Sequence, residues 1–286
     1  MSDHQSMNGI PREDNEELEK LEIKLLLEGL YAWYGYDYRN YAYSSIKRRV
    51  WHRVHAEKLP TISGLLEKIL HDQEVLRRLI ADFSINVTEM FRDPLYFLSF
   101  REQVVPLLRT YPSIRIWLAG GSTGEEVYSM AILWQEEGVY DKTKIYATDI
   151  NAEVLKIAKS GSYSLNQMRK YTNNYFLAGG KRAFSDYYKV SGDRVKFNPD
   201  LRKNVVFAQH NLVTDQSFNE FHVILCRNVL IYFDKSLQER VHDLFYESLT
   251  RFGILGLGDK ETISYTHLAD CYERIGTDQK LYKKIK

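Results

Sequence analysis

The stretch IRIWLAGGSTGEEVYSMAILWQEE, residues 114–137, decides the fold class. Residues 114–119 are an apolar run typical of a buried strand, and the loop 120–124 separates them from a helical segment. Further strands and helices are expected over residues 144–148, 152–159, 222–226, 237–251, 253–257 and 280–285. This alternation predicts an α/β fold with a parallel sheet whose faces are covered by helices. Its ligand site should lie at the carboxyl ends of the strands, where the strand order reverses.

The chain before residue 113 is different, because it contains helical spacing of apolar residues without a run of alternating strands. Leu59-Pro60-Thr61 separates two of these helices, and Thr61 or Ser63 is the candidate cap of the second. We therefore expect four regions: a flexible tail (1–14), an N-terminal helical domain (15–85), a linker helix region (86–112) and an α/β domain (113–286).

A small antiparallel β subdomain is expected within the α/β domain, at about residues 181–207. Two β-rich segments, 184–190 and 194–197, flank Ser191-Gly192-Asp193, which is a tight hairpin-turn signal.

Composition excludes several classes of protein. The 39 Lys and Arg nearly balance the 38 Asp and Glu, which argues against a protein that mainly coats nucleic acid. The two cysteines, Cys226 and Cys271, are far apart and support neither a disulfide framework nor a metal site. No apolar run is long enough to span a bilayer, and the polar N-terminus lacks an apolar signal region. We expect a soluble, cytoplasmic protein.

The loop Gly120-Gly-Ser-Thr-Gly124 can approach a ligand closely, because glycine permits tight backbone turns. It is not a phosphate-binding P-loop, since no Gly-Lys-Ser/Thr follows it. Glu125 and Glu126 open the next helix and would repel a pyrophosphate, but they suit a cationic or hydroxyl-bearing ligand. An ordinary strand–helix turn with acidic first-turn residues is the alternative.

Asp149 ends the second strand, where nucleotide-binding α/β folds hold ribose hydroxyls. Together with the acidic glycine loop it favours an adenosyl ligand without phosphates, and S-adenosylmethionine fits this description. Arg227 and Asn228 follow the next central strand and should reach the same crevice. Alternatively, Asn228 caps a turn and Tyr232 packs in the core.

The segments NVTEMFRD (86–93), GGSTGEEVYS (120–129), ATDI (147–150), HNL (210–212) and CRNVLIYF (226–233) occur in the order found in the chemotaxis receptor methyltransferase (CheR) family. The resemblance covers roughly residues 20–286. It implies a Rossmann-like S-adenosylmethionine methyltransferase fold and the methylation of glutamate side chains on bacterial chemoreceptors. S-adenosylhomocysteine would be the product. Two departures stand out: Val127 replaces the usual proline after STGEE, and Gly258-Asp-Lys-Glu261 replaces GHSE.

The same resemblance implies roles for individual residues. Cofactor contacts are implied for Asn86, Thr88, Arg92, Gly120, Gly124, Glu126, Asp149, Asn211, Leu212, Arg227 and Asn228. Arg92 and Tyr232 match the positions nearest the transferred methyl group, and we expect them to be catalytic. No metal is expected.

Residues 44–58 offer a basic docking surface for the acidic methylation helices of a receptor, through Lys47, Arg48, Arg49 and Arg53. A simply solvated charged face is the alternative. The turn 191–193 is short, so independence from a C-terminal receptor peptide is expected. Rival functions are a methyltransferase acting on RNA or a small molecule, a non-catalytic adaptor of the same fold, and a nicotinamide oxidoreductase.

Overall fold

The computed structural model describes residues 12–83 and 88–286, and the chain divides into two compact units, Met1–Ile85 and Asn86–Lys286. The expected tail, 1–14, lies mostly outside the described residues. Its last three residues are helical, because the first helix begins at Arg12.

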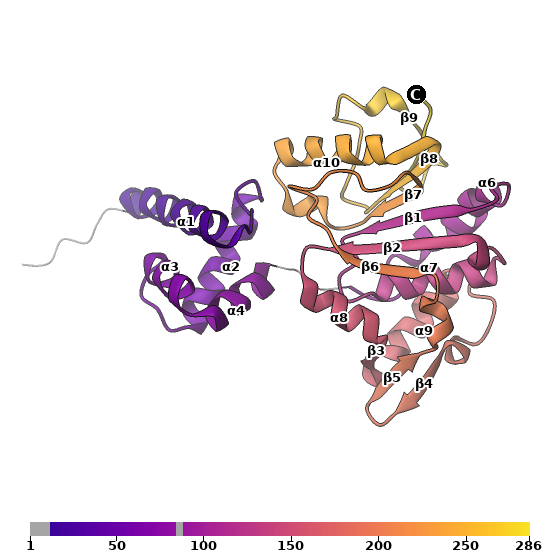
Figure 1. Ribbon diagram of the computed structural model, residues 1–286, viewed down its shortest axis with the longest axis horizontal. Helices are drawn as coiled ribbons and strands as arrows, with labels where there is room; N and C mark the ends of the chain where they lie inside the picture. The colour runs from indigo at the N-terminus through magenta and orange to yellow at the C-terminus, as the bar shows by residue number, and fades with distance from the viewer. Residues whose placement is uncertain (1–11, 84–87) are drawn as a thin grey trace, which may run out of the picture. The chain divides into compact units, whose positions relative to one another are not determined.

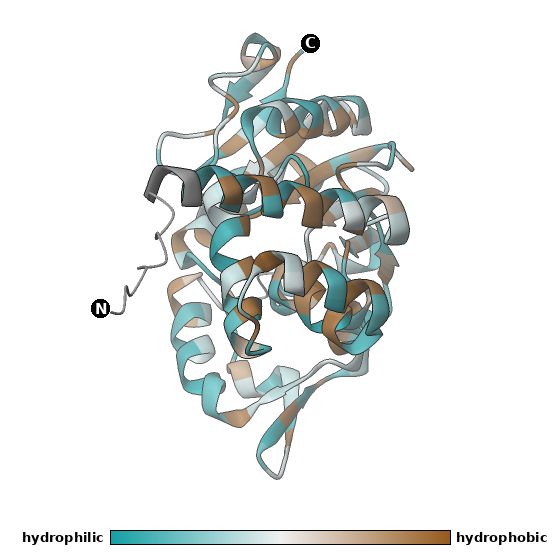
Figure 2. Ribbon diagram, turned by 90° about the vertical axis from the view of Figure 1, so that its left-hand side faces the viewer, coloured by the Kyte–Doolittle hydropathy of each residue, from teal (hydrophilic) through white to brown (hydrophobic). Residues whose placement is uncertain are grey.

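The N-terminal unit is a cluster of helices: α1 (Arg12–Tyr34), α2 (Tyr43–Ala56), α3 (Ile62–His71) and α4 (Gln73–Phe83). Leu26, Leu30, Val50 and Ile69 are completely buried in its core. Brown and teal segments alternate along these helices in Figure 2, because each helix has an apolar and a polar side. The helices thus bury their apolar sides against one another.

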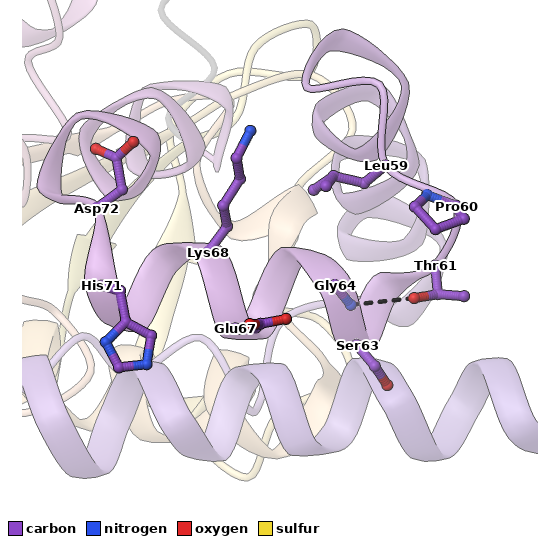
Figure 3. A pocket seen from close by; sticks show the side chains of 9 residues that line it. All are labelled: Leu59, Pro60, Thr61, Ser63, Gly64, Glu67, Lys68, His71 and Asp72. Carbon is purple, nitrogen blue, oxygen red and sulfur yellow. Dashed lines mark hydrogen bonds between the residues drawn. The ribbon is translucent and has the colours of Figure 1, made fainter.

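Thr61 begins α3 as predicted: its hydroxyl oxygen accepts a hydrogen bond from the Gly64 N–H at 3.1 Å. A hollow of about 670 Å³ lies beside this helix and is lined by residues between Leu59 and Asp72 (Figure 3). It includes none of the residues expected to contact the cofactor.

The second unit contains a large sheet with helices against it (Figure 1). Its strands are β1 (Ile114–Ala119), β2 (Thr143–Asp149), β6 (Val205–Gln209), β7 (Phe221–Cys226), β8 (Leu249–Leu257), β9 (Tyr272–Arg274) and β10 (Leu281–Lys284). Its α-helices are α5 (Pro94–Ser99), α6 (Val105–Leu108), α7 (Glu125–Glu136), α8 (Ala152–Ser160), α9 (Met168–Leu177) and α10 (Lys235–Ser248). A π-helical segment, Phe100–Val104, joins α5 to α6.

The strand order of the large sheet is β6-β2-β1-β7-β8-β10-β9. The strands from β6 to β8 are parallel, whereas β10 runs antiparallel to both β8 and β9. The α/β fold is therefore confirmed, but the sheet is mixed rather than wholly parallel. The strand order reverses between β1 and β7. From β1 the chain passes to its neighbour β2 on one side, whereas the neighbour of β1 on the other side is the later strand β7.

The inserted subdomain is a separate antiparallel sheet in the order β3-β5-β4. Its strands are β3 (Ser162–Ser164), β4 (Tyr188–Ser191) and β5 (Arg194–Phe197), and they lie at the opposite end of the unit from the C-terminus in Figure 1. The expected boundaries, 181–207, were wrong at both ends. The earlier strand β3 joins this sheet, whereas β6 belongs to the large one.

No helix within the described residues is long and apolar enough to span a membrane.

Candidate functional site

The loops after β1 and β7 touch where the strand order reverses. Gly120 has φ +80°, and a Cβ atom there would lie 2.5 Å from Cγ2 of Val229. The N–H groups of Gly120 and Gly121 both donate to the carbonyl oxygen of Thr148 in β2, at 2.9 and 2.8 Å. The ends of three adjacent strands are thereby joined, and Gly120 is required because a side chain would separate two of their loops.

Asp149 connects the loop after β2 to the glycine loop. Its Oδ2 atom accepts a hydrogen bond from the Ser122 N–H at 2.9 Å, and its Oδ1 atom accepts one from the Asn151 N–H at 2.9 Å. Burial raises the pKa of the Asp149 carboxyl, and these hydrogen bonds oppose the rise. The carboxylate lies at the carboxyl end of β2, as the sequence predicted.

Arg227 is a buried guanidinium that joins two other segments of the site. Its Nη1 atom lies 3.2 Å from Oε2 of Glu126, and its Nη2 atom lies 2.8 Å from Oδ2 of Asp93. Nη2 also donates to the carbonyl oxygen of Arg92 at 3.0 Å, and the guanidinium carbon lies 4.1 Å from the centre of the Tyr96 ring. The segment before α5, the start of α7 and the end of β7 are therefore held together by one side chain.

Burial raises the pKa of Glu126, while the positive charges of Arg227 and Arg92 lower it. The Arg92 charge therefore acts on the same carboxylate. Two acidic groups, Glu126 in the first turn of α7 and Asp149 at the end of β2, follow adjacent strands, and bringing a positive charge to them would be favourable.

Several residues in these loops have a strained backbone. Phe91, Asp93, Ser122 and Asn228 have φ angles of +51°, +56°, +48° and +61°, although none is glycine. Such conformations cost about 1–3 kcal/mol each and are typical of functional sites, where the surrounding structure enforces them.

Glu261 fixes the loop that contains Asn228. Its two carboxylate oxygens accept hydrogen bonds from the backbone N–H groups of Asn228, Val229, Leu230 and Gly258, at distances between 2.6 and 2.9 Å. Burial raises the pKa of Glu261, and these four donors oppose the rise. The Gly-Asp-Lys-Glu departure therefore keeps the acid that holds the Arg227–Asn228 loop, and alters only the two residues before it.

The remaining predicted site residues are distributed as follows. Asn211 and Leu212 follow β6, next to His210, whose N–H donates to the Asp149 carbonyl at 3.2 Å. Tyr232 is half-buried in the turn Leu230–Tyr232 after Asn228. Thr88 is half-buried, and Asn86 lies outside the described residues.

The predicted docking residues do not form one surface. Arg49 and Arg53 are only 6% and 8% exposed. Arg49 donates to the Phe83 carbonyl at 2.9 Å, and Arg53 lies 2.7 Å from Asp82. Their assignment to a receptor-facing surface was wrong, because their guanidinium groups bind α4 within the N-terminal unit. Lys47 and Arg48 remain: Lys47 is paired with Glu19, and Arg48 is exposed.

Sequence reasoning gave no role to Asp93, Tyr96 or Glu261. Asp93 ends the NVTEMFRD segment, directly before α5, and Glu261 lies in the loop after β8. Nothing in their spacing indicated that they would pair with the loop after β7. Among the described residues, no group of three or more His, Cys, Asp or Glu could hold a metal ion.

Two family models match almost the whole chain. The model for the CheR methyltransferase SAM-binding domain matches residues 86–280, and the model for the CheR methyltransferase all-alpha domain matches residues 21–84. The chain belongs to the CheR methyltransferase family. The CheR resemblance, the methyltransferase fold and the S-adenosylmethionine cofactor expected from the sequence are thereby confirmed.

Curated relatives agree with this CheR assignment. The chain is 50% identical to the putative methyltransferase Cher3 of Pseudomonas putida over 264 residues, which are 92% of this chain and 97% of the relative. It is 32% identical to the chemotaxis protein methyltransferase of Listeria monocytogenes, over 80% of this chain and 85% of the relative. Among solved structures, the N-methyltransferase NodS from Bradyrhizobium japonicum aligns with a TM-score of 0.34 and 11% identity, covering 60% of this chain and 63% of that one.

The residues that follow β1 and β2 fit S-adenosylmethionine by their chemistry. The cofactor carries an ammonium and a sulfonium, and Glu126 and Asp149 supply negative charge and hydrogen-bond acceptors. The glycines at 120 and 124 leave no room for side chains where the loop meets its neighbours. The STGEE loop lacks the Lys-Ser/Thr pair of a phosphate-binding loop, so the donor set suits a cationic ligand rather than a nucleotide phosphate.

Proposed function

We propose that this protein transfers the methyl group of S-adenosylmethionine to glutamate carboxylates of chemoreceptors, giving glutamate methyl esters. The proposal is supported by its CheR family membership and by relatives that are named chemotaxis protein methyltransferases. The observation that carries it is the buried Arg227, which ties the Arg92 segment to Glu126 at the carboxyl ends of β1 and β7. The segment that carries the proposed catalytic Arg92 and the first turn of α7, which carries Glu126, are thus held together by one side chain.

Within this crevice, Glu126 and the loop Gly120–Gly124 would hold the amino-acid end of the cofactor, and Asp149 would hold the ribose. Asn86, Thr88, Asn211, Leu212 and Asn228 are the proposed further contacts. When bound, the cofactor supplies an electrophilic methyl group on its sulfonium. Arg227 would act mainly by fixing the position of Glu126, because its guanidinium is buried and already paired.

Arg92 and Tyr232 are the proposed catalytic residues. A substrate glutamate is already ionised near neutral pH, since its reference pKa is about 4.3, so the enzyme needs no general base. Arg92 would pair with this carboxylate as water leaves it, because a buried charge without a partner is costly. Tyr232 would line the path of the methyl group. Alignment of the two reactants can contribute up to about 7–11 kcal/mol.

The proposed partner is the helical cytoplasmic part of a chemoreceptor, so the protein would act in the cytoplasm. Lys47 and Arg48 are the residues that remain candidates for receptor docking. Independence from a C-terminal receptor peptide is also proposed, because β4 and β5 are joined by only Gly192 and Asp193 and pair directly at Ser191 and Arg194.

The test is methylation of purified chemoreceptor cytoplasmic domains with isotope-labelled S-adenosylmethionine, read by mass spectrometry. We expect labelled glutamates whose methyl groups are released by mild alkali, as esters require. Arg92→Ala should abolish the label, while Arg240→Ala, at an exposed position of α10, should keep it. Cofactor binding without any labelled receptor would instead favour the adaptor function, and alkali-stable label would indicate a different acceptor group.

A further inference from the structure

One side chain of the inserted antiparallel sheet (β3, β5 and β4, the small sheet below) contacts the glycine loop. Tyr163, in β3, is 4% exposed, and its hydroxyl donates a hydrogen bond to the carbonyl oxygen of Thr123 at 2.8 Å. The hydroxyl of Thr123 in turn donates to Oε2 of Glu125 at 2.6 Å. Thr123 is thus fixed on its carbonyl side by the small sheet and on its side-chain side by the first turn of α7.

The glycine loop lies against α8 and β3 without spare room. Gly124 has φ +95°, and a Cβ atom there would lie 2.8 Å from Cβ of Ala158 and 3.0 Å from the Tyr163 hydroxyl. A separation below 3.0 Å requires the neighbouring atoms to move. The conformation of the loop therefore depends on the positions of α8 and Tyr163 as well as on its own sequence.

Aromatic packing makes Tyr163 part of a rigid cluster. Its ring lies 5.9 Å from the Tyr128 ring of α7 and 5.8 Å from the Phe197 ring of β5, in edge-to-face orientations. The Tyr128 hydroxyl donates to the carbonyl of Ala158 at the end of α8, at 3.0 Å. The small sheet, α7 and α8 are therefore held in one arrangement around the glycine loop.

We propose that Tyr163 is a positioning residue for cofactor binding, acting through Thr123 to hold the glycine loop in its binding conformation. The inference rests on the proposed cofactor site, in which this loop receives the amino-acid end of S-adenosylmethionine. It assigns the small sheet a part in cofactor affinity, although Tyr163 acts on the cofactor only through the loop. Removing the Tyr163 hydroxyl should then weaken ligands that carry the amino-acid end and spare ligands that lack it.

The experiment compares Tyr163→Phe with Tyr171→Phe in the full chain by calorimetric titration. Tyr171 is the control, because it is 1% exposed and its hydroxyl donates to Gln167 at 2.6 Å rather than to the glycine loop. The two probes are S-adenosylhomocysteine and 5′-methylthioadenosine, which lacks the amino-acid end. We expect Tyr163→Phe to weaken S-adenosylhomocysteine about fivefold, as for the loss of one neutral hydrogen bond, and 5′-methylthioadenosine less than twofold. Tyr171→Phe should change neither.

Other outcomes separate the inference from the proposed site. Equal weakening of both probes, or no weakening of either, overturns the positioning role of Tyr163. Glu126→Gln tests the site itself: if it binds S-adenosylhomocysteine as the wild type does, the proposed cofactor site is wrong. If Tyr163→Phe does not fold, Thr123→Val is the second variant. It removes the hydrogen bond that the Thr123 hydroxyl donates to Glu125 and so releases Thr123 on its other side. It should show the same selective loss, and its failure to do so also overturns the inference.

Discussion

Glu261 fixes the backbone of Asn228, which lies 33 positions earlier in the chain. Its Oε2 atom accepts a hydrogen bond from the Asn228 N–H at 2.9 Å and stabilises a residue whose φ is +61°. The same carboxylate accepts from Val229 and Leu230 through Oε1, both at 2.8 Å. A side chain from the loop after β8 therefore determines the shape of the loop after β7, which carries Arg227.

Glu261→Gln should destabilise the α/β unit and weaken cofactor binding. A glutamine has one acceptor oxygen, so its NH₂ group would face two of the N–H donors that the carboxylate now satisfies. With about 1–3 kcal/mol for each unsatisfied donor, we expect a loss of about 3 kcal/mol and a melting temperature lower by roughly 6–12 °C. Lys260→Gln, at the exposed neighbouring position, is the control in the same calorimetric scan. A shift of less than 1 °C for Glu261→Gln would contradict this role.

Arg227→Met should be more damaging than Asp93→Asn, although both break the same ion pair. The Arg227 side chain is 1% exposed, and its loss leaves Glu126 without its buried partner, at a cost of about 3–5 kcal/mol. The Asp93 side chain is 50% exposed, so its ion pair contributes less than about 1 kcal/mol. Urea denaturation with and without S-adenosylhomocysteine measures both effects. Similar destabilisation by the two variants would contradict the bridging role of Arg227.

Residues close in sequence to a strand end were the predictable part of the fold and site. Gly120, Asp149 and Arg227 directly follow apolar runs, and parallel strands bring such residues to one edge of a sheet. Thr61 was predictable for a similar reason, since a helix cap is read from local sequence.

Contacts between distant loops and elements were not predictable. The pairing of Glu261 with the Asn228 loop, and of Tyr163 with Thr123, depends on packing between elements that share no local signal. The docking role expected for Arg49 and Arg53 was wrong, because a long arginine side chain can turn inward from its helix and bind a neighbouring helix. A basic helical segment in the sequence does not show which way its side chains turn.

Glu125 should make the unfolding free energy of the α/β unit depend on pH. It is 5% exposed, and burial raises its pKa to about 7. Between about pH 4.5 and pH 7 the folded state retains a proton that the unfolded state has lost, so stability falls as pH rises. The fall is complete above pH 8 and amounts to at most about 3 kcal/mol. Glu125→Gln should remove this component in urea titrations at pH 5, 6, 7 and 8, and parallel curves for the two proteins would contradict it.

Arg53→Glu and Arg48→Glu should act on different properties. Arg53 lies 2.7 Å from Asp82 and 3.2 Å from Glu57, so a carboxylate there would cluster three partly buried acids and unfold the helical unit. Arg48 is exposed, and its reversal should change stability by less than about 0.5 kcal/mol. Circular dichroism melting of the full chain distinguishes them. If Arg48 contacts a receptor, Arg48→Glu should also lower receptor methylation at low salt and have less effect at high salt, because salt screens exposed charges.

Gly124→Ala and Gly192→Ala form a matched pair that isolates the steric requirement of the glycine loop. Both glycines have positive φ, +95° and +62°, so both substitutions carry a conformational cost of about 1–2 kcal/mol. Nothing lies within 4 Å of a Cβ atom at Gly192, whereas a Cβ atom at Gly124 would lie 2.8 Å from that of Ala158. Gly124→Ala should therefore cost at least about 1 kcal/mol more in thermal melting and weaken S-adenosylhomocysteine binding at least tenfold, while Gly192→Ala leaves binding unchanged. Equal losses of stability and unchanged binding in both variants would mean that the loop can move away from α8, and the close approach of Gly124 would then have no role in the cofactor site.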